Sequence, residues 1–181
     1  IKGMYLGFRE DTFLHSFSTS TFESAVRERM GVTLEYNLRP EFWAKAAYYY
    51  SIYSRNFKNS NNFNEEVNLR PLDVLLFTAS HRREDVLDNP QTLSANLKRD
   101  DYRIRVTTEP NRRISAGADY TLSHYTDKNN KFIYGFDVKS QLIYEPTSLS
   151  LTYRYEEYGY HYPSQIYFSP GKFHYNTMTA E

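Results

Sequence analysis

The clearest pattern in this chain is a strict alternation of apolar and polar side chains. Between Met30 and Leu38, every second residue is apolar, and the residues between them are polar or small. Successive side chains of a β-strand point to opposite faces of a sheet, so this alternation predicts a strand with one apolar and one polar face. A helix through the same residues would scatter Val32, Leu34 and Tyr36 around its circumference.

The same alternation recurs along the chain and predicts about ten strands. All seven prolines fall between the predicted strands, as expected for a residue that cannot donate to a strand ladder. Short turns that contain Pro40, Pro71, Pro110 and Pro146 alternate with longer polar links. The predicted strands span residues 3–13, 21–38, 42–56, 63–70, 73–84, 92–109, 113–125, 132–144, 148–157 and 172–181.

Three features of this plan favour a barrel that crosses a membrane. Several predicted strands exceed the ordinary length of ~5–6 residues, the links alternate between short and long, and Tyr and Phe collect toward strand ends. Outer-membrane barrels combine tilted strands of ~9–11 residues, short turns on one side, longer loops on the other, and aromatic girdles. Because lipid cannot hydrogen-bond a bare backbone N–H or C=O, a spanning sheet has to close on itself. The predicted fold is therefore all-β, an antiparallel up-and-down transmembrane β-barrel.

Composition and charge narrow the possible functions. The mean hydropathy is −0.72, and no run approaches the ~18 apolar residues of a membrane helix. Lys and Arg total 22, as do Asp and Glu, and this zero net charge gives no support to nucleic-acid binding. The chain has no cysteine, its five histidines lack metal-ligand spacing, and it contains no HExxH, GxSxG or Walker motif. We therefore expect no metal, no cofactor and no catalytic residues.

Short motifs in the second half of the chain resemble a known family of barrels. The first is Arg82-Arg83-Glu84-Asp85 followed by Asp88-Asn89-Pro90-Gln91-Thr92-Leu93. The second is Gly117-Ala118-Asp119-Tyr120 followed by His124-Tyr125-Thr126-Asp127-Lys128-Asn129-Asn130. The third is Tyr153-Arg154-Tyr155 followed by Tyr167-Phe168-Ser169-Pro170 and Phe173. These patterns are similar to the C-terminal barrels of tetratricopeptide-repeat outer-membrane proteins, a group that includes exporters of cellulose and poly-N-acetylglucosamine.

The resemblance implies a barrel of about 16 strands that follows periplasmic helical repeats. Residues 1–181 are accordingly expected to form a single domain that is part of a larger barrel. The resemblance also implies a location in the outer membrane of a Gram-negative bacterium, with outer-membrane lipid around the barrel. A polysaccharide cargo, and a periplasmic helical-repeat domain or inner-membrane synthase machinery, are the further expected partners.

The predicted function is a porin-like conduit for a hydrophilic polymer, in exopolysaccharide export. Two alternatives remain open. One is a structural or adhesive outer-membrane barrel whose lumen is plugged by side chains, which requires fewer strands than a water-filled bore. The other is a soluble antiparallel β-barrel that acts as a binding protein, since soluble sheets also alternate polar and apolar residues.

The polar face of the predicted barrel is expected to line its lumen. Mixed charges suit the passage of a hydrated, weakly charged polymer, whereas a lining of one sign would select an ion. Trp43, Tyr49 and Tyr53 share this face, where their rings can stack on sugars or simply fill space. The segment 157–171 is interpreted as a solvated outer loop. The expected lumen-lining or cargo-contacting residues are Arg27, Arg29, Glu35, Trp43, Lys45, Tyr49, Tyr53, Arg103, Arg105, Asp119, Asp137, Lys139, Arg154 and Glu156.

Overall fold

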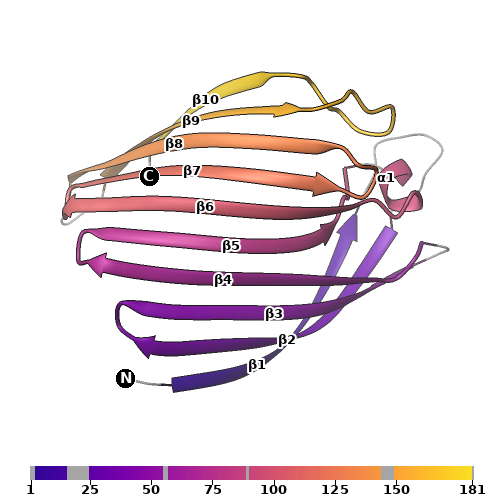
Figure 1. Ribbon diagram of the computed structural model, residues 1–181, viewed down its shortest axis with the longest axis horizontal. Coiled ribbons are helices and arrows are strands. Elements are labelled where there is room, and N and C mark those ends of the chain that lie inside the picture. The colour runs from indigo at the N-terminus through magenta and orange to yellow at the C-terminus, as the bar shows by residue number, and fades with distance from the viewer. Residues whose placement is uncertain (1–2, 16–24, 55–56, 89, 144–148, 181) are drawn as a thin grey trace.

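The chain forms a single sheet of ten antiparallel strands, shown in Figure 1. The computed structural model describes all residues except 1–2, 16–24, 55–56, 89, 144–148 and 181. The elements are β1 (Gly3–His15), β2 (Ala25–Arg39), β3 (Phe42–Tyr53), β4 (Ser60–Leu72), β5 (Leu75–Asp85), α1 (Pro90–Ser94), β6 (Lys98–Asn111), β7 (Ile114–Tyr125), β8 (Asn130–Ile143), β9 (Leu149–Tyr160) and β10 (Phe173–Ala180). Each strand pairs with its neighbours in sequence, which confirms the all-β up-and-down prediction. β1 and β10 are the edges, so the sheet is not closed.

The largest error in the predicted elements lies between β5 and β6. A strand was predicted over 92–109, but β6 begins at Lys98 and the short helix α1 precedes it. Pro90 is the first residue of α1. The N–H of a first helical residue has no partner within the helix, so proline is tolerated at this position. A search for alternation cannot identify this single helical turn, because Leu93 and Leu97 are buried by contacts with distant strands.

Two prolines lie inside strands, contrary to the prediction. Pro71 belongs to β4 and Pro110 to β6, and each lies where the register shifts beside a tight turn. Strand pairing is already interrupted at such a shift, so a residue without an N–H breaks no regular ladder bond there. Both prolines therefore still mark the approach to a turn.

The two faces of the sheet differ as the alternation predicted. On the apolar face, Leu34, Tyr48 and Phe136 are 39%, 49% and 45% exposed. Within the part of the chain that is described, no strand or helix packs over this face. The opposite, polar face carries arginines and carboxylates such as Arg105 and Asp119, which pair with one another across strands.

The two ends of the sheet also differ. Tight turns join β2 to β3, β4 to β5 and β6 to β7 at the left of Figure 1, which we call the turn end. The longer segments 86–97 and 161–172 lie at the opposite loop end. Gly3 pairs with Asn37 and Ala180 pairs with Leu151, so β1 starts and β10 finishes at the turn end. No helix among the described residues is long and apolar enough to cross a membrane.

Candidate functional site

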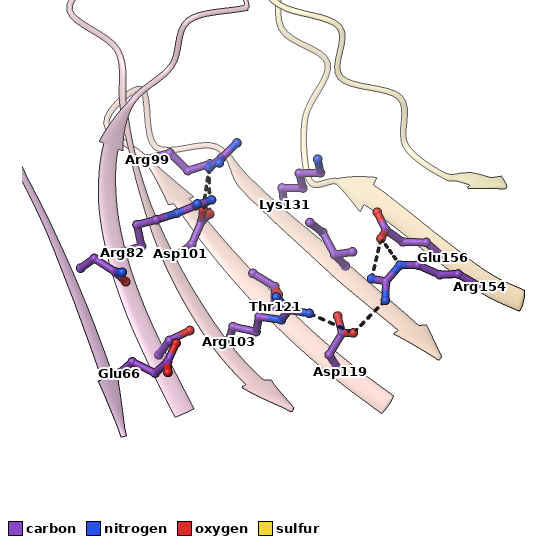
Figure 2. Close-up of a pocket in the computed structure, with 13 residues that line it drawn as sticks. Glu66, Arg82, Arg99, Asp101, Arg103, Asp119, Thr121, Lys131, Arg154 and Glu156 are labelled. Atoms are coloured by element: carbon purple, nitrogen blue, oxygen red, sulfur yellow. Dashed lines mark hydrogen bonds and ion pairs between the residues drawn. The ribbon is translucent and has the colours of Figure 1, made fainter. Parts of the chain in front are cut away.

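A cavity of about 450 Å³ opens on the polar face and extends across β4 to β9 (Figure 2). Its lining consists of charged, amide and hydroxyl side chains together with Ile133. These residues come from alternate positions of neighbouring strands, so the period of two brings them to one side of the sheet. The cavity brings together charged, amide and hydroxyl side chains from six strands, and we take it as the candidate site.

Asp119 on β7 is the centre of an ion-pair network in this cavity. Its Oδ1 lies 2.8 Å from Arg105 Nη1, 3.1 Å from Arg103 Nη2 and 3.3 Å from Arg154 Nη1. The Asp119 side chain is only 3% exposed. A carboxylate tolerates such burial when charged donors replace its water, and three guanidinium groups do so here.

The network continues across β8 and β9. Arg105 Nη2 lies 2.8 Å from Asp137 Oδ1, and Arg154 Nη1 lies 3.2 Å from the same oxygen. Arg154 Nη2 then reaches Glu156 Oε2 at 2.8 Å. Arg105 thus pairs with two carboxylates and Arg154 with three, on different strands, which fixes their planar heads against the sheet. The structure therefore brings together six of the residues that were expected on one face: Arg103, Arg105, Asp119, Asp137, Arg154 and Glu156.

Two glycines provide the space for these arginine heads. A Cβ at Gly117 would overlap the Arg105 guanidinium and would lie 3.2 Å from Asp137 Oδ2. A Cβ at Gly135 would lie 3.2 Å from Arg154 Nη2 and 3.1 Å from the Tyr155 carbonyl oxygen. The arginines can lie flat across β7 and β8 because these positions carry no side chain.

We expect Gly117→Ala to break the Arg105–Asp137 pair. The new methyl group would displace the flexible end of Arg105 rather than the backbone, so the loss should be about 1–2 kcal/mol in the free energy of unfolding. Urea unfolding of the refolded protein measures it. Gly7→Ala is the matched control, since its Cβ would meet nothing closer than Thr33 at 4.0 Å. Equal stability of the two variants would contradict the role given to Gly117.

A second charged group lies toward the loop end of the cavity. Asp101 Oδ2 lies 3.2 Å from Arg82 Nη2, Arg99 Nε lies 2.9 Å from the Asp101 carboxylate, and Ser123 Oγ donates to Asp101 Oδ1 at 2.5 Å. The Lys131 ammonium lies over the rings of Tyr158 and Tyr160, 4.3 and 5.3 Å from their centroids.

Sequence reasoning missed this second group. Arg99 and Asp101 follow the same alternation as Arg103 and Arg105, so extending that pattern toward the start of β6 would have found them. Lys131 was assigned to a link, whereas β8 already begins at Asn130. Arg82 and Glu66 were likewise omitted, although both lie on strands and line the cavity.

Arg105 and Asp137 belong to the network but do not line the cavity itself, and the eight remaining expected residues do not line it either. Glu35 and Lys45 form an ion pair of 2.9 Å between β2 and β3. The Arg29 guanidinium lies 4.5 Å from the Tyr49 ring centroid, and that ring packs against Gly31 on the neighbouring strand. The other expected residues are Arg27, which is buried, and Trp43 and Lys139, which are half-buried.

Tyr53 lies on the polar face but is covered. Its ring packs against Leu93 of α1, and its hydroxyl donates to Asp85 Oδ2 at 2.6 Å. The residue is almost fully buried. This arrangement leaves no open ring face for a passing sugar, so among the expected aromatic contacts only Trp43 and Tyr49 keep exposed surface.

The prediction of a solvated loop over 157–171 is wrong in part, because Tyr160 and Tyr167 are buried while Tyr162 and Phe168 stay 58% and 72% exposed. Asn129 in the β7–β8 turn donates through Nδ2 to Tyr162 O and Tyr167 Oη, both at 2.8 Å, and its Oδ1 accepts from Tyr162 N at 3.0 Å. Tyr160 and Tyr167 are buried in a cluster with Val86, Leu97 and Tyr125. Burial raises the pKa of Tyr167 to about 12, so its phenol stays protonated at neutral pH. The loop end is therefore packed.

We expect Asn129→Ala to release the segment 161–171. The variant loses the three hydrogen bonds that join Asn129 to Tyr162 and Tyr167, which should lower the local opening free energy by about 2 kcal/mol. Amide hydrogen exchange of 161–171 measures the effect. Asn176→Ala, which removes one exposed bond from Tyr153, is the control. Unchanged protection in 161–171 would contradict the assigned role of Asn129.

Comparisons with known proteins give no identification. No family model, curated protein or solved structure matches this chain. The resemblance to tetratricopeptide-repeat exporters therefore stays a prediction. Among the residues that the structure describes, no three acidic or histidine side chains are grouped so that they could hold a metal ion.

Proposed function

We propose that this chain forms the wall of an outer-membrane barrel that conducts a hydrophilic polymer. The observation that carries the proposal is the apolar face, whose large side chains stay exposed along the sheet, as at Ile104 with 62% exposure. Soluble monomers rarely expose contiguous apolar patches beyond a few hundred Å². A lipid bilayer is the surroundings in which such a face is stable.

Strand length supports a membrane span. β3 has 12 residues and β6 has 14. With a rise of ~3.3 Å per residue and a tilt of ~40°, 12 residues cross roughly 30 Å, which matches the hydrocarbon core of a bilayer. In lipid, the free backbone groups of β1 and β10 need partners, so the proposal requires these edges to pair with each other or with further strands.

Charges on the apolar face gather toward the loop end, which suits a lipid surface. His81 lies 3.5 Å from Glu65 and 3.4 Å from Asp100, and Lys172 lies 2.9 Å from Glu157. All of them lie on the loop side of the apolar stretch. Charges near the edge of a bilayer cost only ~0–1 kcal/mol, against ~2–4 kcal/mol for a basic residue at its midplane.

Aromatic rings accompany this boundary. His81 stacks on Tyr102 with centroids 4.4 Å apart, and Phe132 stacks on Tyr134 at 6.0 Å. Rings with a polar edge favour the layer between hydrocarbon and water. They mark one boundary of the bilayer. The longer links at the same end support an orientation in which the loop end reaches the outer surface and the turn end faces the periplasm.

The polar face supports a hydrated bore. Its ion pairs hold the charged heads of Arg105 and Arg154 against the sheet, and the cavity beside them is open to water-sized molecules. We propose exopolysaccharide as the polymer, handed over by a periplasmic helical-repeat domain or by an inner-membrane synthase. The resemblance of the motifs to such exporters motivates this choice of partners.

Conductance and fractionation of the full-length protein test the proposal. We expect it in the outer-membrane fraction, and we expect stepwise ion conductance after its insertion into planar bilayers. Recovery of a folded, monodisperse protein without detergent would contradict the membrane location and favour the soluble binding protein.

A plugged structural barrel is the second candidate. The segment 86–97 favours it, because Leu93 reaches Tyr53 on the polar face and so covers part of the loop end. A membrane-inserted protein that never conducts would support this candidate over the conduit.

A further inference from the structure

The two ends of the cavity carry different charge balances. Toward the turn end, the arginines on β6 and β9 meet an equal number of carboxylates, and all of them take part in one ion-pair network. These residues are Arg103, Arg105, Arg154, Asp119, Asp137 and Glu156. The six charges of this network compensate one another, and Glu66 adds a further negative charge to the lining at this end.

Among the residues that line the cavity, positive charge is in excess toward the loop end, and the carboxylates of Glu156 and Asp88 also act on Lys131 from a greater distance. Arg82 and Arg99 share Asp101, whose oxygens also accept the Ser123 hydroxyl. Arg82 additionally lies 3.7 Å from Glu84. No carboxylate among the described residues lies within ion-pair distance of Lys131, whose ammonium rests on two tyrosine rings instead. Figure 2 shows Arg82, Arg99 and Lys131 at the same end of the cavity.

We propose that the loop end of this cavity binds the carboxylate groups of an acidic polysaccharide through Arg99 and Lys131. This inference rests on the proposed conduit function and names the charge class of its cargo. Arg99 donates through Nε to Asp101, and its head also contacts the Tyr125 hydroxyl. A guanidinium has five N–H donors, so these two partners leave donors for a ligand carboxylate. The partly enclosed cavity strengthens such a contact relative to open water.

The direction of the strand favours a chain over a single small anion. Arg99, Arg103 and Arg105 lie on the same face of β6. Alternate residues along a strand are ~7 Å apart, so a polymer that follows β6 from the loop end first meets the positive charge of Arg99 and then the compensated ion pairs of Arg103 and Arg105. This arrangement fits a polyuronate better than a neutral polymer such as cellulose.

Binding in detergent tests the inference without requiring conduction. The probe is a fluorescent oligogalacturonate added to the refolded full-length protein, and a neutral dextran oligomer of equal length is compared with it. We expect saturable binding of the oligogalacturonate that weakens as salt rises, and no binding of the dextran. The double variant Arg99→Gln/Lys131→Gln should weaken binding about tenfold or more.

Two further variants guard against a loss of fold. Asp101→Asn removes the acid that Arg82 and Arg99 share, and it should tighten binding about threefold. Lys58→Gln makes the same change of charge at an exposed loop residue and should leave the affinity unchanged. Equal binding of dextran would overturn the inference, as would unchanged affinity in both cavity variants.

Inorganic phosphate distinguishes a polymer site from a free-anion site. We expect phosphate to displace the oligogalacturonate only when the concentration of phosphate charge far exceeds the concentration of carboxylate charge on the oligogalacturonate. Displacement at equal molar charge would overturn the assignment to a polymer. Binding of oligogalacturonate by a barrel that does not conduct would support this site while contradicting the conduit, so the two failures can be told apart.

Discussion

Ile104→Arg is expected to abolish efficient insertion of the protein into lipid bilayers. Ile104 lies in the middle of β6 on the apolar face, away from the charged groups at the loop end. If this face meets hydrocarbon, a guanidinium near the midplane costs ~2–4 kcal/mol. In a soluble protein, the same change at a side chain that is 62% exposed would stay within about ±0.5 kcal/mol.

The folding free energy of the variant in lipid vesicles, measured by urea titration, decides between these outcomes. Phe168→Arg is the matched control, because Phe168 is 72% exposed but lies in the segment between β9 and β10. It should insert normally. Normal insertion of Ile104→Arg, or a higher yield of soluble folded protein, would contradict the membrane-facing assignment.

Asp119→Asn is expected to have the largest effect of any single change on the polar face. The amide keeps the shape of the side chain but removes the negative charge that Arg103, Arg105 and Arg154 share. Removal of one partner from a buried ionic network leaves uncompensated charge and should cost about 3 kcal/mol in the free energy of unfolding.

Urea unfolding in vesicles measures this loss, and planar-bilayer reversal potentials should also shift toward anion selectivity. Asp73→Asn removes the same charge from an exposed position in the tight turn between β4 and β5, and it should alter neither property. A loss below about 0.5 kcal/mol for Asp119→Asn would mean that the network contributes little to stability.

The fold was predictable because one physical rule governs most of the chain. A strand with one apolar face must alternate, so the sequence around Leu34 and Tyr48 already shows which side chains share a face. The same rule correctly placed Arg105, Asp119 and Asp137 together. It could not show which of them pair, because that depends on the register, in which Arg105 lies opposite Asp119 and Gly117 lies opposite Asp137.

The loop end could not be predicted, for a different reason. Tyr160 and Tyr167 are buried by Val86 and Leu97, which are far away in sequence. Long-range contacts of this kind leave no local period. The polar appearance of 157–171 does not separate the residues that stay exposed, such as Tyr162 and Phe168, from Tyr160 and Tyr167, which are buried.

The glycines beneath the arginine heads have a consequence for transport. Because Gly117 and Gly135 have no side chain, Arg105 and Arg154 lie flat along the strands, and these two long cationic side chains protrude little from the surface. A sliding polymer would meet weak, closely spaced binding contacts instead of strong contacts with side chains that project into the bore. In the conduit that we propose, such a lining would lower friction for a moving chain, so bulky replacements at the two glycines should slow translocation even where the strands still assemble.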